Sequence, residues 1–156
     1  MKTRITFILI LLQSLIFSEK IDLITTNDLH GAISEQMAYF MNPQFPPKII
    51  GGSGLYKYIN DNLDKNNSII LDGGNFFQGH PVGIIDSGRT IIDWMNKVGY
   101  DALVPGQNDF LFGYQNLIAL SKLANFPFLG ANIVNNKNEY IFDPYVIIEI
   151  KGVKIG

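Results

Sequence analysis

Short apolar stretches alternate with stretches of helical periodicity along most of the chain, and this alternation constrains the fold more than any other feature. The apolar runs cover residues 21–26, 68–71, 102–104, 128–131 and 145–150. Apolar residues at helical spacing mark residues 54–64, the region from Ile91 to Val98, and the region from Leu117 to Leu123. Strands that alternate with helices are typical of a mostly parallel sheet covered by helices. Ligand sites in such α/β folds lie at the carboxyl ends of the strands.

The first residues have the pattern of an export signal. Lys2 and Arg4 form a basic start, and an apolar run from Ile5 to Phe17 follows. This run is too short for a comfortable membrane span and fits a signal-peptide core. We expect residues 1–18 to be a signal peptide, so that the protein is exported to the periplasm or the extracellular space. An uncleaved membrane anchor is the alternative, because Ile16 stands where a small residue is preferred at the cleavage site.

Composition excludes several classes of function. The net charge of −2 provides no basic surface for nucleic acid. The absence of cysteine excludes disulfides and cysteine-based zinc sites. A phosphate-bearing substrate would therefore need a local positive centre, such as a metal ion. Neither the composition nor the motifs indicate an oligomeric state.

The last residues predict a β-hairpin. Residues 145–150 and 153–156 flank Lys151-Gly152, and the second strand stops after a few residues. We expect residues 19–156 to be one domain that is incomplete at its C-terminus, because a strand that stops there leaves an unpaired edge. The alternative is a short edge strand in a complete protein.

Polar clusters follow the first three predicted strands. They are Thr26-Asn27-Asp28-Leu29-His30-Gly31, Asp72-Gly73-Gly74-Asn75-Phe76-Phe77-Gln78-Gly79 and Gly106-Gln107-Asn108-Asp109-Phe110-Leu111-Phe112-Gly113. An Asp-x-His sequence just after a strand can direct a carboxylate and an imidazole at one metal ion. A capping Asp beside a surface His gives the same pattern, so this sequence alone is weak evidence for a metal site. The occurrence of three polar clusters after successive strands strengthens it.

These clusters resemble the motifs of calcineurin-like metallophosphoesterases, in their 5′-nucleotidase branch. The second cluster is similar to that branch's Asp-Ala-Gly-Asp-x-Phe-Gln-Gly, and the third to its Gly-Asn-His-Glu/Asp-Phe-Asp-Tyr/Phe-Gly. Further matches are residues 99–102, 126–132, 144–145 and 152–156, in the family's order. The resemblance implies a layered α/β metallophosphoesterase fold, with a mostly parallel sheet and flanking helices, of which this chain is the N-terminal part.

The resemblance also implies a chemistry and assigns residues to it. The family uses two divalent metal ions to bind a phosphate ester, to activate water and to stabilise charge on the attacking and leaving oxygens. Asp28 and His30 match ligands of the first metal. The bridging Asp of the family falls at Asn75, and its second-metal Asn falls at Gln107. The family's catalytic His falls at Asn108, and a later Asp falls at Leu111.

These replacements weaken the expected metal site. Asn75 has no charge and one oxygen acceptor, so it should bridge two cations poorly. Asn108 cannot act as an acid near neutral pH. We therefore expect one metal ion or none here. His80 matches no family ligand and is expected at the surface, and Asp72 and Asp109 are expected to stabilise their loops.

The sequence is compatible with three hypotheses about function. The first is a hydrolase of nucleotides or related phosphate esters, represented by a truncated and partly degenerate copy. The second is an inactive family member that binds a ligand or a partner, and the third is a remnant of a broken gene. The replaced residues Asn75, Gln107 and Asn108 favour the second or third hypothesis, whereas the motif around Asp28 and His30 favours descent from an active enzyme.

Overall fold

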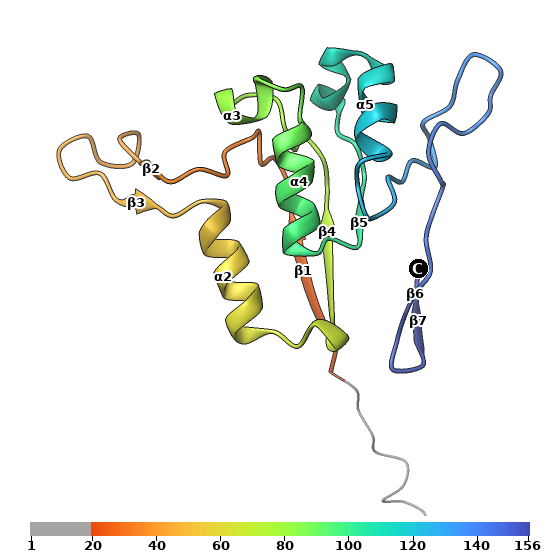
Figure 1. Cartoon of the computed structure of the whole chain (residues 1–156), viewed down its shortest axis with the longest axis horizontal. Helices are drawn as coiled ribbons and strands as arrows, with labels where there is room; N and C mark the ends of the chain where they lie inside the picture. Colours follow the sequence, from red (N-terminus) through yellow and green to blue (C-terminus); the bar gives the residue numbers. More distant parts are fainter. Residues whose placement is uncertain (1–19) are drawn as a thin grey trace, which may run out of the picture.

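The computed structural model describes residues 20–156, so the predicted signal peptide, residues 1–18, lies outside the described residues. Figure 1 shows the arrangement of the elements. In chain order they are β1 (Asp22–Thr26), β2 (Gln36–Met37), β3 (Lys48–Ile49), α2 (Gly52–Asn62), the 3₁₀ helix η1 (Lys65–Asn67), β4 (Ser68–Asp72), α3 (Pro81–Ile84), α4 (Arg89–Val98), β5 (Ala102–Leu103), the 3₁₀ helix η2 (Gln107–Phe112), α5 (Tyr114–Ser121), β6 (Ile148–Ile150) and β7 (Val153–Ile155).

The central sheet is parallel and has the strand order β1-β4-β5. Thr26 is in register with Asp72, and Asp72 with Leu103, so the three strands end at one edge of the sheet. Single parallel bridges from Leu103 to Phe128 and from Leu129 to Asp143 continue the sheet. The predicted α/β fold with a mostly parallel sheet is confirmed. The expected strand at 128–131 is reduced to these isolated bridges.

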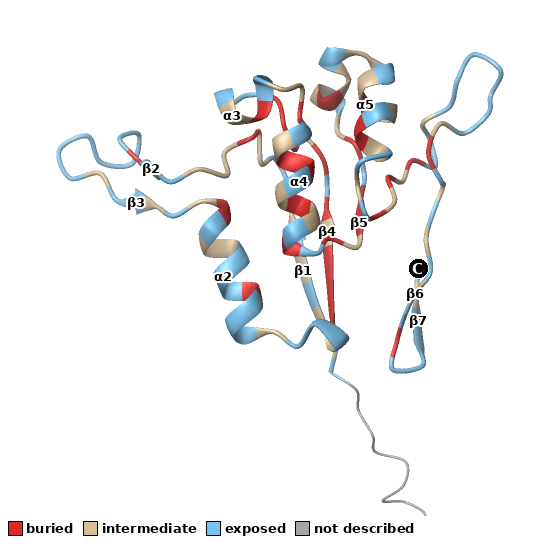
Figure 2. Cartoon of the chain, in the orientation of Figure 1, coloured by how far each residue is buried: buried red, intermediate tan, exposed pale blue. Residues whose placement is uncertain are grey.

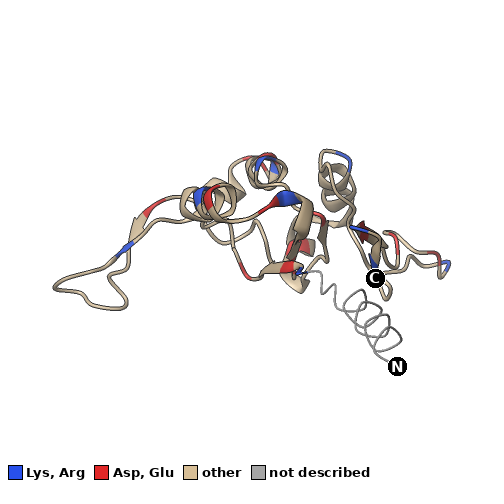
Figure 3. Cartoon of the chain, turned by 90° about the horizontal axis from the view of Figure 1, so that it is seen from below, with Lys and Arg blue, Asp and Glu red and all other residues tan. Residues whose placement is uncertain are grey.

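The helices lie on one side of this sheet, as the view from below in Figure 3 shows. The side chains of Ile70 and Leu103 belong to a core cluster that also includes apolar residues of α2, α4 and α5, and the partly buried Ile24 packs against it. In Figure 2 the buried residues gather along β4, β5 and the inward side of α4. The prediction of flanking helices therefore holds for this face of the sheet.

The opposite face of the sheet carries a groove of about 500 Å³. Leu23, Ile69, Leu71 and Ala102 line its sheet side, and residues of the segment 144–156 line another side. Leu23 is 63% exposed and Val104, which also lines the groove, is 45% exposed. Parallel sheets are normally covered on both faces, so apolar exposure of this kind is unusual.

In helix α4, the apolar spacing and a terminal glycine determine which residues are helical. Ile91, Ile92, Met95 and Val98 are buried on one side of the helix, at the spacing expected for an amphipathic helix. Gly99 follows in the left-handed conformation, with φ 89°, and its N–H bonds to the Met95 carbonyl. Glycine adopts this conformation without steric cost, so the helix ends where the sequence predicts.

Residues 32–52 differ from the long loop that the prolines and glycines predict. Two very short strands, β2 and β3, pair there in antiparallel fashion, with Gln36 opposite Ile49. Two-residue strands carry no detectable periodicity, which explains why the pattern misses them. The predicted C-terminal hairpin is present as β6 and β7. Within residues 20–156 no helix combines the length and the apolar character needed to cross a membrane.

Candidate functional site

The polar clusters meet at the carboxyl edge of the sheet, where β1, β4 and β5 end. The loop after β1 lies along the loop after β4 through a series of backbone hydrogen bonds. Asp28 N donates to Gly74 O (3.0 Å), His30 N donates to Asn75 O (2.8 Å), and Gly31 N donates to Phe76 O (2.9 Å). Two segments that are distant in sequence thus form one surface, on which Asp28, His30 and Asn75 come together.

The backbone at this surface adopts a rarely populated conformation. Asp28, His30 and Asn75 all have positive φ, at 54°, 48° and 56°. Non-glycine residues in this region are uncommon and concentrate at functional sites, where the surrounding structure maintains them. Of the six described non-glycine residues with positive φ, three are therefore residues that the family motifs place at the site.

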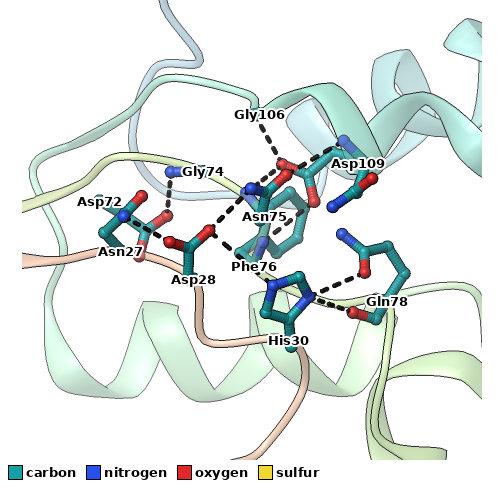
Figure 4. A network of polar contacts seen from close by, with 11 residues as sticks. Asn27, Asp28, His30, Asp72, Gly74, Asn75, Phe76, Gln78, Gly106 and Asp109 are labelled. Atoms are coloured by element: carbon teal, nitrogen blue, oxygen red, sulfur yellow. Dashed lines mark hydrogen bonds and ion pairs between the residues drawn. The ribbon is translucent and has the colours of Figure 1, made fainter.

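The carboxylate of Asp28 contacts two amide side chains and faces one imidazole. Asn75 Nδ2 donates to Asp28 Oδ1 (2.7 Å), and Asn27 Nδ2 donates to Asp28 Oδ2 (2.7 Å). His30 Nε2 lies 3.8 Å from Asp28 Oδ1. Figure 4 shows these side chains around Asp28.

The imidazole of His30 is oriented by Gln78. His30 Nδ1 lies 2.9 Å from the Gln78 carbonyl oxygen and 3.0 Å from Gln78 Oε1. A carbonyl oxygen only accepts hydrogen bonds, so Nδ1 carries the proton and Nε2 faces Asp28. The hydrogen bonds to the Gln78 side chain and backbone raise the pKa of His30 above its ordinary value.

Gln78 itself is buried, and its Nε2 atom has no hydrogen-bond partner among the described residues. Gln78 lies within the second polar cluster, but the resemblance to the family assigns it no role. Its position beside the imidazole suggests that it orients His30. No sequence signal indicates this role, because the contact joins residues that are 48 positions apart.

Asp109 connects the second and third polar clusters. Its carboxylate has no exposed surface and accepts hydrogen bonds from the backbone N–H groups of Asn75 (2.7 Å), Phe76 (3.0 Å) and Gly106 (2.8 Å). Burial raises the pKa of Asp109 to about 6, although these hydrogen bonds act in the opposite direction. The expected loop-stabilising role of Asp109 is confirmed.

Asp72 has a similar role at the end of β4. Its Oδ1 accepts a hydrogen bond from Gly74 N (2.8 Å), which confirms that it caps the turn. Its Oδ2 accepts a hydrogen bond from Thr26 Oγ1 (2.6 Å), and Thr26 Oγ1 also contacts the hydroxyl of Tyr100 (2.8 Å). Burial raises the pKa of Asp72. The contribution of Thr26 and Tyr100 does not follow from the sequence pattern, because Tyr100 is 74 positions from Thr26.

The remaining predicted site residues are placed less tightly. Asn108 approaches the group through its backbone, because Asn108 N donates to Asn75 Oδ1 (3.0 Å). Gln107 is exposed, and its side chain makes no polar contact with the others within the described part of the chain. Leu111 is 73% exposed. His80 is half-buried rather than a free surface residue. Its Nδ1 accepts a hydrogen bond from the Val82 N–H at the start of α3.

The donor set does not fit a pair of divalent ions. Among residues 20–156 no group of three or more His, Cys, Asp or Glu side chains could hold a metal ion. Asp28 Oδ1 and His30 Nε2 face each other, but Asn75 presents an N–H group to Asp28 rather than a lone pair. Two ligand atoms are fewer than the three or four protein ligands of a tight site. These residues would hold at most one ion, weakly.

Comparisons with known proteins give relatives of one kind. The chain is 32% identical over 148 residues to the snake venom 5′-nucleotidase of Gloydius brevicauda, a match that covers 89% of this chain and 25% of the relative. It is 27% identical over 140 residues to the 5′-nucleotidase of Vibrio parahaemolyticus, covering 88% of this chain and 24% of that protein. The chain therefore spans about a quarter of the length of these relatives. No family model matches the sequence.

A solved structure supports the same relationship. The fold is similar to the crystal structure of the calcineurin-like phosphoesterase YfkN from Bacillus subtilis, with a TM-score of 0.64 and 26% sequence identity. This similarity covers 86% of the present chain and 45% of that one. Sequence and fold thus point to one group of proteins, although each comparison covers only part of the longer relative.

Proposed function

Because this chain belongs to the calcineurin-like phosphoesterases, in their 5′-nucleotidase branch, we propose that it is the N-terminal part of a domain that hydrolyses nucleotides or related phosphate esters. The observation that carries this proposal is the meeting of Asp28, His30 and Asn75 at the carboxyl edge of the sheet. In α/β folds this edge is the usual place for a ligand. The loops after β1, β4 and β5 occur in the order of the family motifs.

The residues at the site also support the proposal that this chain of 156 residues is, on its own, a weak or inactive catalyst. Asn75 replaces a bridging carboxylate, so the negative charge that would offset two cations is missing. Asn108 can donate a hydrogen bond to a phosphoryl oxygen but cannot transfer a proton near neutral pH. His30 is the one imidazole at the site among the described residues, and Gln78 fixes its orientation.

Metal titration combined with phosphate release tests this proposal. The full chain should bind Mn²⁺ or Zn²⁺ through Asp28 and His30 no more tightly than the millimolar range, and should release little phosphate from a nucleoside monophosphate. A triple variant, Asn75→Asp with Gln107→Asn and Asn108→His, should bind metal more tightly because it restores ligand types. Without further ligands it should remain a poor enzyme.

Two outcomes would contradict the proposal in different ways. Robust hydrolysis by the unmodified chain would show that the neutral residues at positions 75, 107 and 108 do not impair catalysis. Metal binding by the triple variant that is no tighter than that of the unmodified chain would show that these positions do not belong to a metal site. Asp28→Ala serves as the control, because it removes a proposed ligand from both proteins.

A binding module without turnover is the second candidate function. The neutral side chain of Asn75 keeps the loops in contact, since the Asn108 backbone N–H donates to Asn75 Oδ1. A site that keeps its geometry after losing charged ligands can still hold a ligand. Titration with a fluorescent nucleotide separates the two candidates. Saturable binding without phosphate release, also with added metal, would favour the binding module.

We propose further that the protein is exported, from the basic start and apolar run of residues 1–18. A reporter fused to residues 1–30 should leave the cytoplasm. Retention of the reporter in the cytoplasm would contradict export, and its retention in the membrane would favour an uncleaved anchor. A fusion that lacks residues 2–17 provides the control.

A further inference from the structure

The carboxylate of Asp28 lies between two side-chain amides, and each amide donates a hydrogen bond to it. Its Oδ1 accepts a hydrogen bond from Asn75 Nδ2 and its Oδ2 accepts one from Asn27 Nδ2, each at 2.7 Å. Figure 4 shows Asn27 and Asn75 on either side of Asp28. Each oxygen of the carboxylate that the family resemblance assigns to a metal therefore already has a hydrogen-bond donor.

The orientation of the Asn75 amide follows from its other partner. The oxygen and nitrogen of a carboxamide have nearly the same shape, so their assignment depends on the surrounding hydrogen bonds. Asn108 N is a backbone donor, and it lies 3.0 Å from Asn75 Oδ1. Because this donor requires an oxygen, the NH₂ group of Asn75 must face Asp28. A flipped amide would place two donors against each other.

In the conformation observed, this orientation excludes a metal ion shared between Asn75 and Asp28 Oδ1. The single side-chain oxygen of Asn75 is engaged by Asn108 N, and its nitrogen presents a hydrogen to Asp28 Oδ1. A cation that binds Asp28 Oδ1 at this point would have to displace the NH₂ group of Asn75 from it. The partial positive charge of the NH₂ group instead satisfies the carboxylate, as a cation would.

We propose that the Asn75 carboxamide takes the place of a divalent cation as the positive group beside Asp28. The connection from Asp28 through Asn75 to Asn108 then joins the loops after β1, β4 and β5 by hydrogen bonds alone. The site accordingly keeps its geometry without metal. This inference concerns the assembly of the site, so it stands or fails separately from any hydrolytic activity of the chain.

Thermal unfolding of the full chain with and without divalent metal tests the proposal. The midpoint of the unmodified protein should differ by no more than about 2 °C between EDTA and 1 mM MnCl₂, because binding in the millimolar range or weaker gives little stabilisation at this concentration. Asn75→Asp places a second carboxylate against Asp28. Its midpoint should fall in EDTA by on the order of 5 °C, and MnCl₂ should restore much of the loss.

Asn138→Asp is the matched control. Asn138 is also an asparagine with positive φ, at 63°, but it lies in an exposed turn outside the site. Its replacement reports the cost of Asp in the left-handed conformation without the contact to Asp28, and should give no metal response. The proposal is wrong if MnCl₂ raises the midpoint of the unmodified chain as much as that of Asn75→Asp. It is also wrong if Asn75→Asp is as stable as Asn138→Asp in EDTA.

A second measurement uses the unmodified chain and remains informative if Asn75→Asp does not fold. The side-chain amide signals of Asn75, assigned by triple-resonance NMR, should exchange slowly with water because Nδ2 is hydrogen-bonded to Asp28. These signals should move little in about 0.05 mM ZnCl₂, a concentration far below the millimolar range in which Asp28 and His30 could bind the ion. Loss of protection or a large shift on adding zinc would show that a metal displaces the amide, and would overturn the proposal.

Discussion

A carboxylate without exposed surface lies beneath the candidate site, and it shows how a single residue can link protonation to stability. Asp109 accepts three backbone hydrogen bonds, yet burial raises the pKa of Asp109 to about 6. In the unfolded chain its pKa is near the ordinary 3.8. The folded state therefore binds the Asp109 proton more tightly than the unfolded state does between these two values.

From this difference we predict the sign of a pH effect. The contribution of Asp109 to the free energy of unfolding should be fully present below pH 3.8 and should decrease by roughly 2 kcal/mol between pH 4 and pH 7. Asp109→Asn removes this titration. Chemical denaturation of both proteins at several pH values measures the effect as the wild-type value minus the variant value.

The comparison has a clear opposing outcome. The difference in free energy of unfolding between the wild type and Asp109→Asn could instead stay constant or increase from pH 4 to pH 7. In that case the three N–H groups outweigh burial and the pKa of Asp109 is not raised in the folded state. Subtraction of the variant removes the contributions of the other carboxyl groups, since they titrate in both proteins.

At the scale of elements, the close approach of the second and third polar loops depends on Gly74. This residue has φ 95°, and a Cβ atom added to it would lie 2.2 Å from Gly106 N and 2.5 Å from Val104 O. Both neighbours are backbone atoms and cannot rotate away. The contact between the loop after β4 and the loop after β5 therefore requires a residue without a side chain.

We predict that Gly74→Ala lowers the free energy of unfolding by more than about 3 kcal/mol, because it adds overpacking to conformational strain. Gly99→Ala is the matched control, since Gly99 has a similar φ of 89° and nothing within 4 Å of an added Cβ. That variant should cost only about 1–2 kcal/mol, the strain of a left-handed alanine. Equal losses in urea denaturation would show that the loops do not pack as closely as described.

The sequence predicted the elements whose burial is periodic and missed those that depend on tertiary contacts. Helix α4 was located from Ile91 to Val98, and β4 from its apolar run, because a buried face imposes a spacing on the chain. The pairing of β2 with β3 leaves no such spacing. At the site, the motif located Asp28 and His30 but not the direction of Gln78, since contacts between side chains do not follow from their order in the chain.

At the scale of the whole molecule, the apolar groove on the second face of the sheet is the feature that most affects behaviour in solution. Leu23 and Val104 are 63% and 45% exposed there, beside Tyr145 at 67%. Apolar surface of this kind is associated with contacts to further polypeptide or with aggregation. The relatives are about four times as long as the chain, and the described residues leave this face open.

We predict that the isolated chain binds an apolar fluorescent dye and self-associates as its concentration rises. The double variant Leu23→Thr with Val104→Thr should reduce both effects, because threonine keeps the strand preference and lowers the apolar area. Ile85→Thr is the control, since Ile85 is 86% exposed and does not line the groove. Dye fluorescence and sedimentation velocity measure the outcome. A control variant that is as effective as the double variant would contradict the role of the groove.

The parallel pairing of β1 with β4 also has a consequence for the time course of folding. Thr26 and Asp72, whose side chains meet at the ends of these strands, are separated by 46 positions. Helix α2 lies between the two strands in the chain, so no local turn can bring their ends together. Contacts of such long sequence separation slow folding, because the entropy of closing the loop is lost before the contacts form. The loops that carry Asp28 and Asn75 extend from the ends of β1 and β4, so they should meet no earlier than these two strands pair.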